Sequence, residues 1–457
     1  MFSRTHAAGP PRRPAPPGAS HCTIICSFRS VIGHKHATPA SGVHGSFTAS
    51  TSPGLSVAKV TVIGHAEGSA TRSVTLDGTT YPAEEIAQGA AFEVFATQPA
   101  PGFLPNPRPG ARWPFRRFVH ATEVGSALDG LEDEPLLMPV TRALDWTALH
   151  KLTQSPAAAA QLAPIRRTAA VRRGTRMIKF LTGRQLGGHL RGWPISGFCY
   201  RAFDVAHLRT PADLAILSGG SPDADGGVVF AIRWRAVDPW DYEVPLAGAY
   251  DGLVAMPPHD RLGSPVIGTG FTPSGRHIVP EFVTRDLAEL PVPANTSLVA
   301  YTGDGTEVTL YTYLPEQRAW SRMYGPQWRH LLPDTIAADQ EYFPTSTPLT
   351  RYVGRYRDNV YEAIVDPPGE FRVAARTRAA RYPLDALARR IPSATWRDAP
   401  CTVVREEGDW LRLRLSRPDG DQVARLGAHC VERGLYEAWA PAAEVTDPRE
   451  DDHWYEL

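Results

Sequence analysis

Two short segments carry residue types that suit ligand binding. Residues 268–275 are rich in glycine, threonine and serine, as phosphate-binding loops are. Such a loop must open a helix so that free amides face the anion, but Ile278, Val279 and Pro280 follow instead. His259 and Asp260 are two candidate metal ligands, yet no spacing places the further ligands that a metal site needs. We interpret both segments as surface loops and predict no metal site.

A third candidate site combines four residues from distant segments. Arg201 lies on an expected early strand, Thr269 or Thr272 in a central segment, and Glu307 at the start of a late strand. This order resembles that of ADP-ribosyltransferases. The resemblance implies an arginine that holds the phosphates of NAD, a threonine that shapes the nicotinamide pocket and a glutamate that polarises the ribose.

The same segment also departs from that family. It has no Ser-x-Ser element, and Gly305 stands two residues before Glu307, where the family commonly has Glu or Gln. We therefore keep an NAD-using transferase on residues 198–314 as the alternative function. The preferred interpretation is a surface Arg201 and a hairpin Glu307, with no catalytic residue and no cofactor.

A binding surface is the other candidate, in the C-terminal part. Trp410 alternates with Arg412 and Arg414, so the three share one face of an expected strand and form a stacking platform if that face is exposed. We favour a core position for Trp410, because small β-domains are short of apolar volume. The residues assigned to binding are Trp396, Trp410, Arg412, Arg414 and Trp439.

The elements around the third site indicate an α+β domain over residues 177–345. Strands are expected at 197–203 and 228–236, and Thr210-Pro211-Ala212-Asp213 predicts the capped start of a short helix. The clearest signal is a hairpin over residues 297–314, in which Asp304-Gly305 supplies the turn.

The C-terminal part contains a degenerate repeat with an offset of 40 residues. Residues 356–358 align with residues 396–398, and Val373 aligns with Leu413. Asp419, Gln422 and Gly427 delimit a two-turn helix in a longer second copy. The arrangement of short strands resembles SH3-like barrels, so we predict two of them in tandem.

The N-terminal part reads differently. Residues 1–120 contain proline-rich tracts without a sustained period, which predicts a largely disordered extension, although a small β unit within residues 55–98 is the minority interpretation. Two alanine-rich helical stretches, broken at Pro156 and Pro164, follow in an Ala/Arg-rich linker over residues 121–176. Met177 is an alternative translation start, so the native protein need not contain residues 1–176.

Composition limits the partners. The 48 basic residues equal the 48 acidic residues, so there is no electrostatic argument for nucleic acid or a membrane. The five cysteines are far apart and form no CxxC pair, which indicates a reduced, cytoplasmic protein.

Arginine usage and the passages at 177–203 and 396–445 resemble a hypothetical protein family of GC-rich actinobacteria, which implies no activity. Of the basic residues, only four are lysines. We expect a mixed α+β fold and a non-catalytic protein-interaction protein, in an immunity or regulatory role, with an unidentified protein partner. The predicted parts are 1–120, 121–176, 177–345, 346–391 and 392–457.

Overall fold

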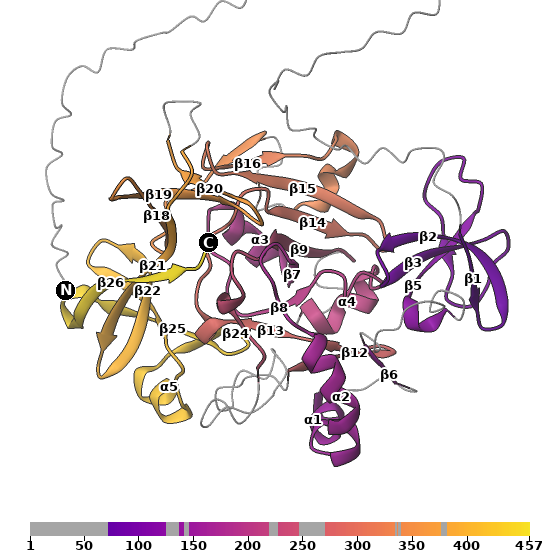
Figure 1. Cartoon of the computed structure of the whole chain (residues 1–457), viewed down its shortest axis with the longest axis horizontal. Coiled ribbons are helices and arrows are strands. Elements are labelled where there is room, and N and C mark those ends of the chain that lie inside the picture. The colour runs from indigo at the N-terminus through magenta and orange to yellow at the C-terminus, as the bar shows by residue number, and fades with distance from the viewer. Residues whose placement is uncertain are drawn as a thin grey trace, which may run out of the picture. The chain divides into compact units, whose positions relative to one another are not determined.

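A computed structural model describes residues 72–124, 137–140, 146–218, 227–245, 270–333, 336, 340–375 and 382–457 (Figure 1). Within these residues the fold is mostly antiparallel β-sheet, so the predicted α+β class is wrong. The helices are few and short. They are α1 (Trp146–Thr153), α2 (Pro156–Thr168), α3 (Gly183–Leu190), α4 (Pro211–Ser218) and α5 (Gly420–Leu426).

Residues 72–124 form a five-stranded sheet with its own core. The strands, in the order β1-β2-β3-β5-β4, are β1 (Arg72–Leu76), β2 (Thr79–Ala87), β3 (Ala91–Ala96), β5 (Phe115–His120) and β4 (Leu104–Pro105). Val74, Val94 and Val119 are buried between them. The prediction of a disordered extension is therefore wrong for residues 72–120, because alternating apolar residues on short strands bury enough surface to pack.

The predicted linker is a packed part of the molecule. Helices α1 and α2 pack on a small sheet of β6 (Met138–Pro139), β11 (Phe271–Ser274) and β12 (His277–Pro280), through Leu149, Leu162 and Phe271. Pro164 lies inside α2 and does not end it, contrary to the predicted break.

A nine-stranded antiparallel sheet forms the centre. Its order is β10 (Tyr242–Glu243), β13 (Phe282–Thr284), β8 (Phe198–Arg201), β7 (Arg176–Leu181), β9 (Val229–Arg235), β14 (Ser297–Tyr301), β15 (Glu307–Leu314), β16 (Ala319–Arg322) and β17 (Tyr342–Pro344). Both faces are buried, one around Met177 and Phe230 and the other around Ile178 and Val229. The predicted 297–314 hairpin is present as β14 and β15.

A second nine-stranded sheet takes the place of the two predicted barrels. Its order is β20 (Glu370–Val373), β19 (Asn359–Asp366), β18 (Arg351–Tyr356), β21 (Ala386–Trp396), β22 (Ala399–Glu407), β23 (Trp410–Leu415), β25 (Leu435–Pro441) and β24 (His429–Glu432), with β26 (Val445–Tyr455) paired to β21. The long β21 pairs with β18 in its first half and with β22 in its second. This strand joins the two halves into one open sheet, so neither half closes into a barrel.

The 40-residue offset is visible as two equivalent turns. Arg357 and Asp358 join β18 to β19, and Arg397 and Asp398 join β21 to β22. Their φ angles are 48° and 64° in the first turn and 48° and 65° in the second. The same local turn sequence therefore adopts the same left-handed geometry in both hairpins.

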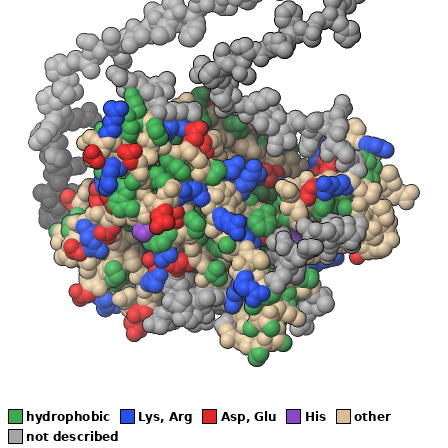
Figure 2. Space-filling view, viewed as in Figure 1, with side chains coloured by type: hydrophobic (Ala, Val, Ile, Leu, Met, Phe, Trp, Pro, Cys, Tyr) green, Lys and Arg blue, Asp and Glu red, His purple; other side chains and the backbone are tan. Residues whose placement is uncertain are grey.

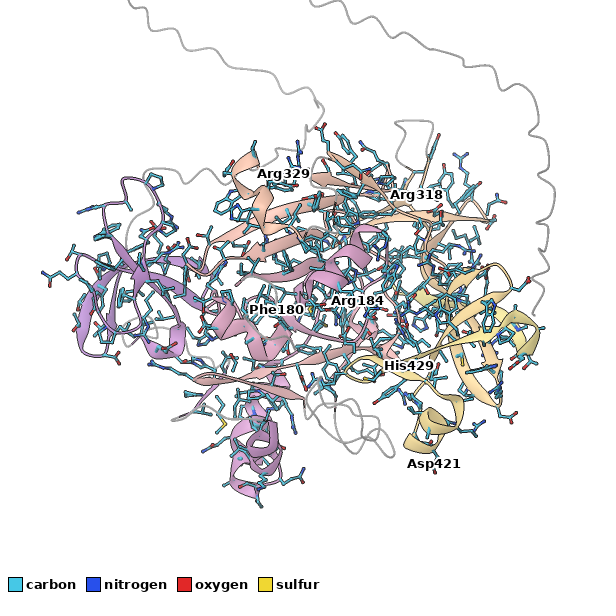
Figure 3. All side chains as sticks on the ribbon, turned by 180° about the vertical axis from the view of Figure 1, so that it is seen from behind. Phe180, Arg184, Arg318, Arg329, Asp421 and His429 are labelled. Atoms are coloured by element: carbon cyan, nitrogen blue, oxygen red, sulfur yellow. The ribbon has the colours of Figure 1, made fainter. Side chains whose placement is uncertain are left out.

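Buried ion pairs join this second sheet to the central part. Arg433 contacts Glu281 at 2.5 Å, with side chains 4% and 0% exposed. Glu432 on β24 pairs with Lys179 on β7 and accepts a hydrogen bond from Gln185 on α3 at 3.0 Å. Figure 3 labels Arg184 on α3 and His429 on β24, on these two neighbouring elements. Arg433, Glu281 and Lys179 are buried in this contact, and Glu432 and Gln185 are partly buried, so these polar groups link the two sheets.

None of the helices in the described part of the chain has the length and apolar character that a membrane crossing requires.

Candidate interaction surface

Two exposed tryptophans lie on neighbouring strands of the second sheet. Trp410 on β23 is 50% exposed and Trp439 on β25 is 42% exposed. Residues directly opposite each other on paired strands share a face, and Arg412 is opposite Trp439 while Trp410 is opposite Pro441. We call Trp410, Arg412, Trp439 and Trp193 the tryptophan–arginine surface.

Trp193 borders this surface from the central part of the molecule. It follows α3, is 37% exposed, and its ring centre lies 5.2 Å from the guanidinium carbon of Arg412. This distance is that of a cation–π contact. The surface therefore presents three exposed indole side chains and one arginine, and two separate segments of the chain supply them.

Arg412 is paired with a carboxylate of the same protein. Its Nε donates to Glu437 Oε2 at 2.5 Å, and Arg414 donates to the other oxygen of the same carboxylate at 2.7 Å. Burial alone raises the pKa of Glu437, but Arg414 and Arg412 outweigh it and hold that pKa below its usual range. Glu437 is therefore ionised near neutral pH, and Arg412 shares this one carboxylate with Arg414.

Arg414, the next residue on the same face of β23, is covered by the central part of the molecule. Arg414 is buried and lies 3.3 Å from Glu289 of the central part. Burial raises the pKa of Glu289 to about 7, with Arg414 opposing that shift. Arg414 thus belongs to the packing between the two sheets, and its assignment to ligand binding is wrong.

Trp396 is not part of this surface either. It is 3% exposed and lies in the core with Leu413 and Tyr436, while its Nε1 donates to Glu444 at 3.3 Å. Two expectations are therefore wrong. Trp396, which was assigned to binding, lies in the core, and Trp410, for which a core position was favoured, is exposed. Trp396 points inward because it follows Ala394 on the buried face of β21 at a spacing of two residues.

Sequence reasoning missed Trp193. Gly192, which has a φ of 95°, and Pro194 flank it, so it stands in a turn between regular elements. A large apolar side chain in a turn has no strand or helix face that would bury it, and this signal was available from the sequence.

The structure does not bring the residues of the transferase alternative together. Arg201 on β8 and Glu307 on β15 are separated by β7, β9 and β14. Four strand spacings amount to roughly 19 Å. The two also belong to opposite faces, because Arg201 is in register with Met177 and Glu307 with Tyr301, which line different clusters.

Each of these residues has an internal partner instead. Arg201 binds Asp204 at 2.7 Å and the carbonyl oxygen of Thr168 at 2.9 Å. Glu307 lies 2.6 Å from both Arg209 and Arg233, and these cations lower its pKa although burial opposes them.

Thr272 is fully buried and donates to Glu281 at 2.5 Å. Its segment forms the β11–β12 hairpin, not the predicted loop. The remaining candidates, Thr269, His259 and Asp260, lie outside the described residues. Because Arg201, Glu307 and Thr272 all bind other side chains of the protein, we interpret them as structural residues.

The described residues contain a small cavity and no cluster of metal ligands. A cavity of about 60 Å³ lies where the two large sheets meet, lined by Val292, Tyr313 and Ile364. Arg318 and Glu362, which also line it, pair with each other. A space of this size holds a few water molecules. In the part of the chain that is described, no three His, Cys, Asp or Glu side chains are placed to hold a metal ion.

Comparison of the chain with protein-family models, with curated proteins and with solved structures finds no match.

Proposed function

We propose that the chain is a non-catalytic protein-interaction protein of the cytoplasm, and that a protein partner docks on the tryptophan–arginine surface. One observation carries the proposal: Trp410, Trp439 and Trp193 are all more than a third exposed, Trp193 contacts Arg412, and the register of β23 and β25 places the other two on the same face as Arg412. Tryptophan and arginine dominate the energetics of protein interfaces, whereas an isolated soluble domain gains nothing from exposed indoles.

The charge of the surface favours a protein over a nucleic acid. Single-stranded nucleic acids also stack on aromatic rings, but their binding depends on cations free to contact phosphates. Arg412 is paired with Glu437, and the chain has no net charge. Figure 2 shows basic and acidic side chains interspersed over the face that it presents. A partner segment with apolar side chains and few charges fits this surface.

The cysteines are consistent with the proposed compartment. Cys199 and Cys401 are buried and Cys430 is partly buried, and none of the three forms a disulfide. Burial raises the pKa of Cys199 to about 12, so its thiol is unreactive at neutral pH. A reducing cytoplasm leaves such thiols unchanged.

Selection of peptides tests the proposal. Peptides from a displayed random library are selected on the full chain, and their Kd is measured by fluorescence or calorimetry. We expect Trp439→Ala and Trp410→Ala each to weaken binding by roughly 10- to 100-fold, because each removes an exposed anchor from the centre of the contact.

Trp454→Ala is the matched control. Trp454 is 38% exposed on β26 and lies against Arg355, outside the tryptophan–arginine surface, so its replacement should leave the Kd unchanged. Equal losses in all three variants, or no selected peptide that depends on Trp410 or Trp439, contradict the proposal. Binding of oligothymidylate with the same tryptophan dependence assigns the surface to nucleic acid instead.

A further inference from the structure

Three buried histidines meet where the N-terminal sheet contacts the rest of the protein. His120 ends β5 of that sheet, His207 lies in the segment between β8 and α4, and His277 begins β12. Their exposed fractions are 1%, 5% and 2%. The ring centres are 5.1 Å apart for His120 and His207, 5.3 Å for His120 and His277, and 4.8 Å for His207 and His277. We call these three side chains the histidine cluster.

The hydrogen bonds of the cluster are incomplete. Thr122 bridges two of the rings, since its hydroxyl lies 2.9 Å from His120 Nδ1 and 3.3 Å from His277 Nε2. His120 Nε2 and both ring nitrogens of His207 are buried without a hydrogen-bond partner. These rings therefore pack mainly as aromatic side chains, and no acceptor is in place for the extra proton of an imidazolium.

The charged groups around the cluster are paired with one another. On the side of the N-terminal sheet, Glu123 is shared between Arg117 at 3.3 Å and Arg276, from the turn before β12, at 3.4 Å. On the segment of His207, Asp204 is paired with Arg201, and Arg209 with Glu307.

These surroundings keep the histidines neutral. Burial, and then His277, lower the pKa of His120 to about 3. Burial, with His120, His277 and Arg209, lowers the pKa of His207 well below 6.5. Burial also lowers the pKa of His277, where Glu123 opposes the shift and Arg276 adds to it.

We propose that the histidine cluster is an acid-sensitive contact, which holds residues 72–124 against the rest of the protein while its rings are neutral and releases them when the rings are protonated. Once the contact opens, each histidine is in water and has an ordinary pKa of about 6.5. The open form thus binds more protons than the closed form between pH 6.5 and the lowered values. Opening therefore increases as the pH falls below 6.5, and the contact is fully stable above that value.

A second contact on the same strand contains no histidine. Arg116 on β5 donates to the carbonyl oxygen of Asp304 at 2.9 Å and to Thr306 Oγ1 at 3.1 Å. Together with the pair of Glu123 and Arg276, this contact also joins the N-terminal sheet to the rest of the protein. We assign the acid sensitivity to the histidine cluster, and local opening should precede acid unfolding of the two large sheets.

Hydrogen–deuterium exchange of the full chain tests the proposal between pH 7.5 and 4.5, with rates corrected for the intrinsic pH dependence. We expect exchange in residues 72–124 to rise by about tenfold at pH 5.5 for each histidine that titrates. Exchange in β21 should stay constant over the same range. A simultaneous rise in both regions means global acid unfolding and overturns the proposal.

His207→Phe separates this mechanism from simple packing. Phenylalanine keeps a planar ring and removes two nitrogens that have no partner, so the variant should be as protected as the wild type at pH 7.5 and better protected at pH 5.5. His277→Gln, which keeps a polar group for Thr122, serves if the first variant misfolds and should reduce the rise at pH 5.5. An unchanged response in a folded variant overturns the proposal.

Two controls complete the experiment. His429→Phe replaces an exposed histidine on β24, outside the cluster, and should keep the full pH response of the wild type. EDTA at pH 7.5 should have no effect on exchange. Loss of protection on chelation, together with one transition-metal ion per chain by elemental analysis, assigns the cluster to metal binding and overturns the acid-sensitive contact.

Discussion

Replacing Asp241 with alanine is expected to lower the free energy of unfolding by ~3–5 kcal/mol, because it leaves a guanidinium buried without its counter-charge. Arg389 on β21 lies 3.0 Å from Asp241, and both side chains are 1% exposed. The hydroxyl of Tyr455 donates to the same carboxylate at 2.9 Å and 3.0 Å. The substitution therefore disrupts both long strands, β21 and β26, where they meet the central part.

The neighbouring pair on the same strand is the control. Arg390 contacts Asp452 at 2.6 Å, but the side chains are 23% and 22% exposed, so Asp452→Ala should cost only ~1 kcal/mol. Urea unfolding followed by fluorescence measures both variants. Equal losses for Asp241→Ala and Asp452→Ala contradict the structural assignment.

The pKa of Asp241 leads to a further expectation for this pair. Burial raises that pKa to about 6 although Arg389 opposes the shift. The cost of removing the carboxylate from water therefore exceeds the stabilisation that the ion pair with Arg389 provides. An apolar pair of similar volume, Asp241→Leu with Arg389→Met, should therefore be much more stable than Asp241→Ala alone. A double variant as unstable as the single one would show that Tyr455 carries the effect.

Leu413→Ala is expected to lower the free energy of unfolding by ~2–5 kcal/mol, because it opens a cavity in the core of the second sheet. Leu413 on β23 is fully buried and packs with Trp396, Val403 and Tyr436. Thermal or urea unfolding of the full chain measures the loss.

Val373 provides the comparison because the repeat makes it equivalent to Leu413. The sequence alone predicts similar losses at both positions, but Val373 lies on the edge strand β20 and is only partly buried. We now expect Val373→Ala to cost ~1 kcal/mol, and Arg412→Ala and Arg372→Ala to stay within ~1 kcal/mol. A larger loss at Arg412 than at Leu413 would reverse the assigned faces of β23.

Local signals in the sequence were reliable where neighbouring residues decide the structure. The capping box of Thr210 and Asp213 predicted α4, and Asp419 with Gly427 predicted α5. The Asp304-Gly305 turn predicted the β14–β15 hairpin. In each case the deciding hydrogen bonds or φ angles lie within a few residues of one another.

Features that depend on distant pairing were not predicted. The two-barrel prediction was wrong because β21 pairs with β18 and with β22 and so joins both halves, and its other partner, β26, has a mostly polar sequence without apolar alternation. The N-terminal sheet was missed because prolines, such as Pro82 in β2 and Pro105 in β4, obscure strands that pack on each other.

The candidate surface was predicted in part. The sequence placed Trp410, Arg412 and Arg414 on one face of a strand, since alternation along a strand is local, whereas the position of Trp439 opposite Arg412 comes from the pairing of β23 with β25. Which face is exposed depends on the partner sheet, and Trp193 comes from a segment more than 200 residues away in sequence. No pattern within the C-terminal part could supply either fact.

The long strand β26 also bears on how the protein avoids assembling with itself. Among the described strands it pairs with β21 alone, so one of its edges offers unpaired backbone groups to any other extended chain. The exposed residues of β26 include Asp447, Pro448, Arg449 and Glu450. Another extended chain that pairs along this strand would therefore meet a run of charged side chains in place of apolar ones, and it would find no amide hydrogen at Pro448. These features oppose sheet growth from β26 between copies of the protein.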